Sequence, residues 1–105
     1  MIQIRYSPEA FRLELNGHAG SAPAGSDLVC CSASTLLFTL YNHLLERGID
    51  IDSELDNISG HALIIAKPKE DEMHDCSIMF DLIYEGLRDL ADEYGDYAKL
   101  SEKGV

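Results

Sequence analysis

Apolar and polar residues alternate in two short stretches near the start of the chain. The apolar positions are Ile2, Ile4 and Tyr6 in the first stretch and Phe11, Leu13 and Leu15 in the second. A period of two is typical of a β-strand that is buried on one face only. The segment between them, Ser7-Pro8-Glu9-Ala10, contains residues that favour turns. The pattern therefore predicts an antiparallel hairpin whose second strand ends at Asn16-Gly17.

A helical period replaces the alternation from Leu28 onwards. One apolar face carries Val29, Ala33, Leu36, Leu37, Leu40 and Leu44, and a second face carries Phe38, Tyr41 and Leu45. Asp27 suits the N-cap position, where a carboxylate accepts hydrogen bonds from the first backbone N–H groups, and Gly48 suits the end of the helix. A helix that is apolar on two faces must be covered on both. We expect one face to pack on the sheet and the other on a second helix or another subunit.

The second half of the chain repeats the order of strands and helix. Residues 49–52 alternate again and residues 60–67 hold the apolar run Leu63-Ile64-Ile65, which predicts a second antiparallel pair before Pro68. From about Glu72 to Tyr94 the helical period returns, with an apolar stripe of Met79, Leu82, Ile83, Leu87, Leu90 and Tyr94. Residues 96–105 are expected to form a short turn and a frayed tail. The order β-β-α-β-β-α predicts a single α+β domain over residues 1–105, with two helices packed on one face of an antiparallel sheet.

The charge balance narrows the choice of partners. The 105 residues include 19 acidic and 8 basic side chains, which gives a formal net charge of −11. A negative field of this size repels phosphates, so we expect no direct contact with nucleic acid, and it attracts a basic partner. An acidic surface can also serve only to keep a small protein soluble, and the composition does not decide between these two roles.

Cysteine usage and the N-terminus bear on the compartment. No uninterrupted apolar run approaches the roughly 20 residues that span a bilayer, and Met1-Ile2-Gln3-Ile4-Arg5 lacks the features of a signal peptide. The 3 cysteines are an odd number and two of them are adjacent, which does not suit a disulfide framework. We therefore expect a cytoplasmic protein with reduced thiols and no membrane contact.

Two segments on either side of a loop of small residues carry the residues with chemistry. Gly17-His18-Ala19-Gly20 places an imidazole at the end of the second strand, and Asp27-Leu28-Val29-Cys30 places a thiol in the first turn of the helix. With Asp27 as the N-cap, Cys30 is the third helical residue, where the helix dipole stabilises a thiolate and backbone N–H groups can bind an oxyanion. An imidazolium beside the thiolate stabilises it further. We interpret His18 as a base and Cys30 as a nucleophile.

Structural explanations stay open for these residues. A cysteine in an apolar helix is usually a small core side chain, which is what we expect for Cys31 and Cys76 and the alternative for Cys30. His18 could equally be an ordinary loop histidine. The same tripeptide, Gly-His-Ala, recurs at residues 60–62, where we expect a strand-end surface or packing residue.

Neither a metal nor a cofactor is expected. His18, Cys30 and Cys31 offer soft ligands, but no Cys-x-x-Cys or His-x-x-x-His spacing supports a metal site. Gly20 and Gly25 are not followed by the Lys-Ser/Thr pair that a phosphate-binding loop requires.

At the two motifs the chain resembles the ribosomal-processing cysteine protease family, called Prp. Members of that family carry a Gly-His-Ala-Gly segment, a small-residue loop, and Asp-Ile/Leu-Val-Cys at the start of a helix. Residues 17–20 and 27–30 match these motifs, and Ser34 matches a serine one turn further on. Gly-Leu-Arg-Asp-Leu-Ala at residues 86–91 and the segment 94–97 are also similar to the family.

The resemblance implies an endopeptidase with a Cys–His dyad, carried by Cys30 and His18. The residues that would bind substrate or position the loop are Gly17, Ala19, Gly20, Asp27 and Ser34. Family members are small cytoplasmic homodimers that remove a short N-terminal extension from a large-subunit ribosomal protein. A basic ribosomal substrate and a homodimer are therefore expected here, without a cofactor.

The chain departs from the family at two positions. Cys31 stands where alanine is usual, and Ser21 stands where an aromatic residue is often found. Two other functions also stay open. One is a non-catalytic, acidic homodimeric binding module or chaperone for a basic ribosomal protein, and the other is a transferase with a thioester on Cys30.

Overall fold

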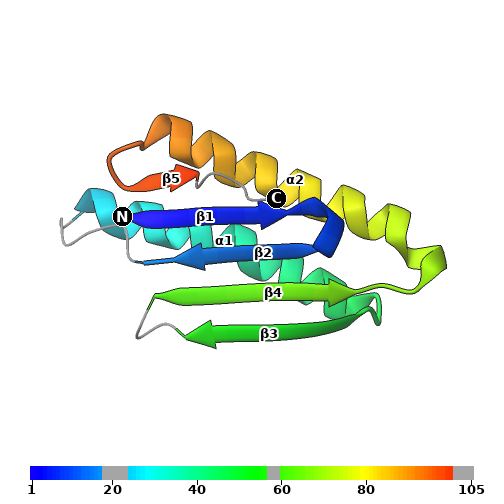
Figure 1. Ribbon diagram of the computed structural model, residues 1–105. Helices are drawn as coiled ribbons and strands as arrows, with labels where there is room; N and C mark the ends of the chain where they lie inside the picture. The colour runs from blue at the N-terminus through cyan, green and yellow to red at the C-terminus, as the bar shows by residue number, and fades with distance from the viewer. Residues whose placement is uncertain (18–23, 57–59, 101–105) are drawn as a thin grey trace.

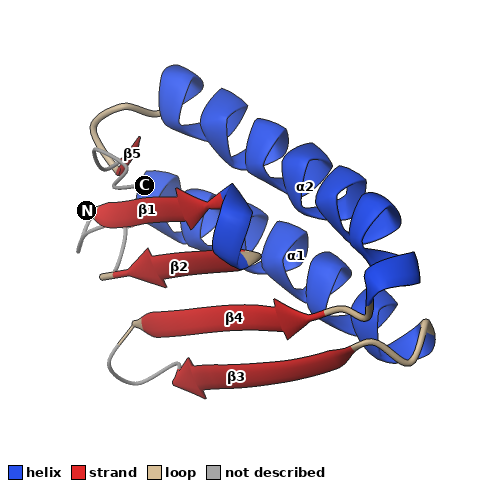
Figure 2. Cartoon of the chain, turned by 45° about the vertical axis from the view of Figure 1, so that its right-hand side comes forward, coloured by secondary structure: helices blue, strands red, loops and turns tan. Residues whose placement is uncertain are grey.

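A five-stranded sheet and one layer of two helices make up the described part of the chain. The structure, a computed structural model, describes residues 1–17, 24–56 and 60–100. In chain order its elements are β1 (Ile2–Ser7), the 3-10 helix η1 (Pro8–Ala10), β2 (Arg12–Asn16), α1 (Ala24–Glu46), β3 (Asp50–Asp56), β4 (His61–Lys67), the 3-10 helix η2 (Glu70–Glu72), α2 (Met73–Glu93) and β5 (Ala98–Leu100). The strands follow the order β3-β4-β2-β1-β5, and both helices lie on the same face of the sheet (Figures 1 and 2). The predicted α+β fold is confirmed.

The N-terminal hairpin forms where the alternation predicts it. β1 and β2 pair antiparallel, with Ile4 opposite Leu15. Between them lies η1, which is followed by its C-cap residue Phe11. The φ of Phe11 is 50°, in the left-handed region. Phe11 therefore precedes β2 instead of belonging to it, and its ring packs edge-on against Phe80 with ring centroids 6.2 Å apart. This contact with Phe80 of α2 explains why an apolar residue, Phe11, occupies the turn between β1 and β2.

One hydrophobic core lies between the sheet and the two helices. From α1 it receives the fully buried side chains Val29, Ala33, Leu37, Leu40 and Leu44, all on the predicted face. From α2 it receives Cys76, Phe80, Ile83, Leu87 and Leu90. The stripe predicted for α2 was partly wrong, since Leu82 is 65% and Tyr94 37% exposed. Apolar residues occur almost all round the first half of α2, and Phe80 sets which side faces the sheet because burial of so large a ring contributes about 1.5–3 kcal/mol.

The C-terminal segment forms a strand that the sequence pattern did not predict. Ala98, Lys99 and Leu100 make β5, which pairs in parallel with β1. Ile2 N–H also donates to the carbonyl oxygen of Tyr97 at 2.8 Å. The expectation of a frayed tail was wrong for these residues, because three residues are too few for a visible period and the pairing depends on β1.

The length and hydropathy of α1 differ from the expectation that no apolar segment approaches the length of a membrane span. Leu28–Glu46 is long and apolar enough to span a bilayer by length and mean hydropathy alone, which was not expected. The mean hydropathy stays high although residues with hydroxyl and amide side chains interrupt the apolar residues of this segment. In this fold the apolar residues of one face of α1 pack against the sheet, and a helix of a packed core can meet the same criteria of length and mean hydropathy.

Candidate active site

Gly17, at the end of β2, has a conformation that requires glycine. Its φ is +100°, and a Cβ atom built on it would lie 2.5 Å from the carbonyl oxygen of Met1. Its N–H donates to the carbonyl oxygen of Gly60 at 2.8 Å. The backbone is therefore held closely on both sides one residue before His18. The other loop residues expected in the site, His18, Ala19 and Gly20, lie outside the described residues.

The helix that carries the thiol begins earlier than predicted. α1 starts at Ala24, so Asp27 is its fourth residue and Cys30 its seventh. The prediction that Asp27 is the N-cap, with Cys30 third in the helix, was therefore wrong. Pro23 precedes Ala24 in the sequence, and proline is favoured beside a helix start because its missing N–H would have no partner there. Since the helix dipole acts mainly within the first turn, it stabilises a thiolate at Cys30 less than expected.

Cys30 and Ser34 lie on one side of α1, because residues four positions apart are neighbours on a helix. Cys30 is partly buried and packs against the core, whereas Ser34 is exposed. Ser34 also lines a shallow groove along the outer side of α1, together with Cys31, Thr35, Phe38, Thr39 and Asn42. The structure thus places Ser34 on the solvent side of the thiol, where a peptide can reach it.

The other two cysteines differ sharply in environment. Cys76 is completely buried in the core, as expected, and burial together with the charge of Glu72 raises the pKa of its thiol to about 11. Cys31 is exposed, so the expectation that it is a core residue was wrong. It follows Cys30 by about 100° around the helix axis, which turns it away from the sheet.

The end of β2 and the start of α1 lie at the same end of the sheet (Figures 1 and 2). β4 also begins at this end, and Asn16 pairs with His61, its first residue. The two Gly-His-Ala tripeptides therefore start side by side, joined by the Gly17–Gly60 hydrogen bond. His61, expected to be a surface or packing residue, lies at the start of β4 next to Asn16. The repeated tripeptide is a feature of the sequence that agrees with this position, because the two copies begin at neighbouring strand ends.

Among the described residues no cluster of three His, Cys, Asp or Glu side chains could hold a metal ion. The three thiols form no disulfide. The Cys30 thiol is partly buried. It lies next to the groove along the outer side of α1.

Comparison with known proteins identifies the family. The family model described as Cysteine protease Prp matches residues 1–99. A structure of SMU.848 from Streptococcus mutans has 25% sequence identity and a TM-score of 0.78, with 99% of this chain and 96% of that chain covered. The essential ribosomal processing protease Prp from S. aureus, in complex with a covalently linked product peptide, has 22% identity and a TM-score of 0.77, with 98% and 97% covered. No curated protein sequence matches the chain.

The sheet with its single helix layer has the fold of the Prp protease structures. Since the family model spans nearly the whole chain, the protein belongs to the Prp family and is a cysteine protease.

Proposed function

We propose that the protein removes a short N-terminal extension from a basic large-subunit ribosomal protein, with Cys30 as the nucleophile and His18 as its base. The family match over residues 1–99 carries this proposal. A second structure of the S. aureus Prp, at 21% identity and a TM-score of 0.78, contains a substrate peptide. The proposal extends the activity of that protease to this chain.

In the proposed mechanism His18 accepts the thiol proton of Cys30, and Sγ attacks the scissile carbonyl carbon. His18 then donates the proton to the leaving amine, and water hydrolyses the acyl-enzyme. Because Cys30 lies beyond the first turn of α1, activation of its thiol depends more on His18 than on the helix dipole. Gly17, Ala19, Gly20 and Asp27 position the loop in this proposal, and Ser34 contacts the substrate beside Cys30.

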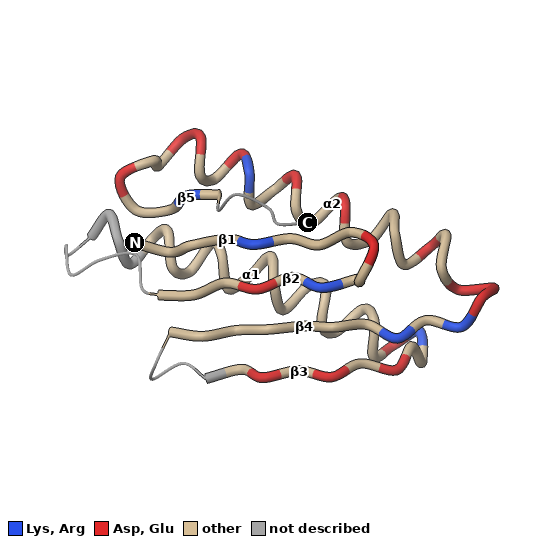
Figure 3. Tube along the Cα trace, in the orientation of Figure 1, with Lys and Arg blue, Asp and Glu red and all other residues tan. Residues whose placement is uncertain are grey.

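The distribution of charge supports a basic substrate. Acidic side chains follow α2 and the edge strand β3, and only Arg88 interrupts them with a positive charge on α2 (Figure 3). A field of this sign accelerates encounter with a cationic protein and weakens with salt. Three reduced cysteines agree with action in the cytoplasm, which we include in the proposal.

We also propose that the protein acts as a homodimer that associates through its helix layer. Large apolar side chains are exposed on both helices, among them Phe38 and Leu45 on α1 and Ile78 and Leu82 on α2. An apolar groove between the helices is lined by Thr39, Leu40, His43, Met79, Leu82 and Ile83. A second copy would cover these apolar side chains.

Mass spectrometry of the ribosomal protein with its N-terminal extension tests the protease proposal. The wild-type enzyme should make one cut near the N-terminus of the substrate, while Cys30→Ala and His18→Ala should leave the substrate intact. Cys31→Ala is the matched control, because it removes an adjacent thiol that points to solvent, and it should cut like the wild type.

Four results would contradict the proposal. Cleavage by Cys30→Ala would exclude Cys30 as the nucleophile. An intact substrate that co-elutes with the wild-type protein would favour a binding module, and transfer of the acyl group to an added amine in place of hydrolysis would favour a transferase. If the wild-type protein neither cleaves nor binds the ribosomal protein, that protein is excluded as the substrate.

A further inference from the structure

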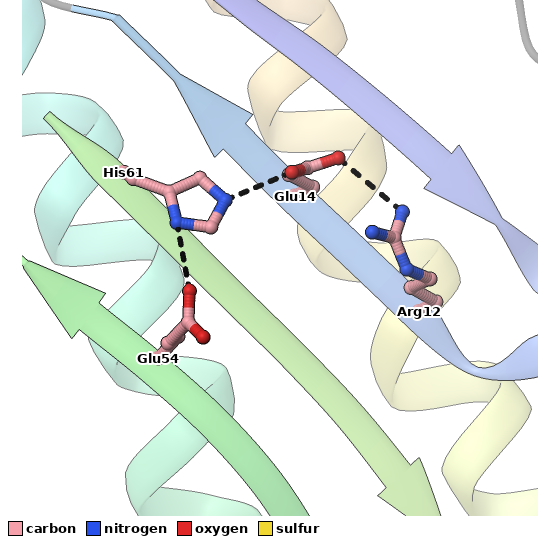
Figure 4. A network of polar contacts seen from close by, with 4 residues as sticks. All are labelled: Arg12, Glu14, Glu54 and His61. Atoms are coloured by element: carbon pink, nitrogen blue, oxygen red, sulfur yellow. Dashed lines mark hydrogen bonds and ion pairs between the residues drawn. The ribbon is translucent and has the colours of Figure 1, made fainter.

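Three strands are joined by charged side chains on the open face of the sheet. His61 on β4 lies between Glu14 on β2 and Glu54 on β3 (Figure 4). Its Nε2 is 2.8 Å from a carboxylate oxygen of Glu14, and its Nδ1 is 3.2 Å from a carboxylate oxygen of Glu54. We call these three residues the His61 clamp.

Both ring nitrogens of His61 face a carboxylate. Nε2 shares a hydrogen bond with Glu14, and Nδ1 lies within ion-pair distance of Glu54. Glu14 also lies 3.3 Å from the guanidinium of Arg12. The hydrogen bond with His61, followed by the charges of Arg12 and His61, lowers the pKa of Glu14, which keeps it a carboxylate.

The clamp lies at the strand ends from which the His18 loop departs. His61 pairs with Asn16, and Gly60 accepts the hydrogen bond of Gly17. These backbone contacts are the last described ones before His18. Because His61 pairs with Glu14 on β2, the β4 end cannot move away from Gly17 without separating this pair. The contact with Glu54 holds the ring of His61 from the side of β3.

We propose that His61, held between Glu14 and Glu54, is a positioning residue that fixes Gly17, the residue before His18, and so supports the reactivity of Cys30. This inference rests on the proposed dyad. A positioning residue of this kind does not contact the substrate. It affects the rate because small displacements of a catalytic group are costly, and about 1 Å can cost roughly 100-fold.

The same sheet offers a matched control. Lys67 pairs with Asp52 at 2.7 Å, and this pair joins β3 to β4 as Glu54 and His61 do. It lies at the other end of β4, away from Gly17. Glu54→Gln and Asp52→Asn therefore remove the same kind of charge from the same face of one strand, at different distances from the site.

The experiment uses two readouts on the full-length protein. Amide hydrogen exchange at Gly17, measured by NMR, reports on the strand end, and the alkylation rate of Cys30 relative to Cys31 reports on the dyad. His61→Gln should raise exchange at Gly17 and slow alkylation of Cys30 about tenfold. Glu54→Gln should act in the same direction but more weakly, because Glu54 is 70% exposed and exposed pairs are weak. Asp52→Asn should change neither readout.

A conservative variant separates positioning from general stability. His61→Arg supplies a positive charge and several donors that can bind two carboxylates, so it should retain most of the Cys30 rate. A loss of thermal stability in His61→Gln without slower alkylation of Cys30 in the folded protein would overturn the proposal, as would unchanged exchange at Gly17. If wild-type Cys30 reacts no faster than Cys31 although exchange at Gly17 responds to His61→Gln, the dyad itself is refuted, and with it the positioning role.

Discussion

Gly17 has a backbone conformation that requires glycine, and it directly precedes His18, the proposed base. Gly17→Ala should destabilise the protein by more than the roughly 1–3 kcal/mol of an unfavourable φ alone, because the new Cβ would meet the Met1 carbonyl oxygen at 2.5 Å. Gly48→Ala is the control, since Gly48 also has a positive φ of +72° but no atom within 4 Å of the added Cβ. Urea unfolding of both variants measures the difference. Equal losses of stability would mean that Met1 moves away without cost.

Glu14 gives the protein a predictable response to acid. Its folded-state pKa lies below the ordinary value of 4.5, chiefly because of the hydrogen bond with His61. A depressed pKa stabilises the folded state above the unfolded pKa, and this contribution is lost as the pH falls through the folded value. The free energy of unfolding should therefore decrease in the acid range, and less so in Glu14→Gln. An NMR titration in which Glu14 titrates at its ordinary pKa would refute this.

At the scale of elements, Tyr6 joins β1 to α2. Its hydroxyl donates to Asp81 at 2.5 Å, and its ring lies 4.7 Å from that of Tyr84. Tyr6→Phe should cost about 0.5–1.5 kcal/mol, more if Asp81 is left poorly solvated. Tyr84→Phe keeps the ring and removes a hydroxyl for which the described residues offer no partner, so it should be close to neutral. Thermal unfolding of both variants makes the comparison, and equal losses would assign the stability to the rings alone.

The elements also show which features can be predicted from sequence. Strands and helices with several periods of apolar residues were predicted correctly, because burial on one face imposes the period. The start of α1 was not, since Ala24, Gly25 and Ser26 carry no period and Asp27 is an attractive cap in sequence. β5 depends on a neighbouring strand rather than on its own pattern. In the candidate site the buried state of Cys76 fits the prediction, but Cys30 lies about one turn further into α1 than predicted. The clamp around His61 required the register of three strands.

The molecule as a whole separates a polar face from an apolar one. The open face of the sheet carries cross-strand charge pairs such as Asp52–Lys67 and the His61 clamp. The two helices instead expose large apolar side chains, and acidic residues recur along α2 (Figure 3). Exposed apolar surface that is rimmed by polar residues is typical of protein–protein contacts, which is why we assign the dimer contact to the helices and leave the sheet face to solvent.

A charge placed in the apolar helix surface should therefore dissociate the proposed dimer. Leu82→Glu introduces a carboxylate at the most exposed apolar side chain of α2, which is 65% exposed, and burial of an unpaired charge opposes association. Met73→Glu is the control, because Met73 is also exposed, at 45%, but lies at the start of α2. Sedimentation equilibrium should find a dimer for the wild type and Met73→Glu and a monomer for Leu82→Glu.

Since each copy carries a net charge of −11, added salt should strengthen the wild-type dimer by screening the repulsion. A wild-type protein that stays monomeric at micromolar concentration and high salt would refute the dimer, and dissociation by Met73→Glu alone would place the contact at the other end of α2.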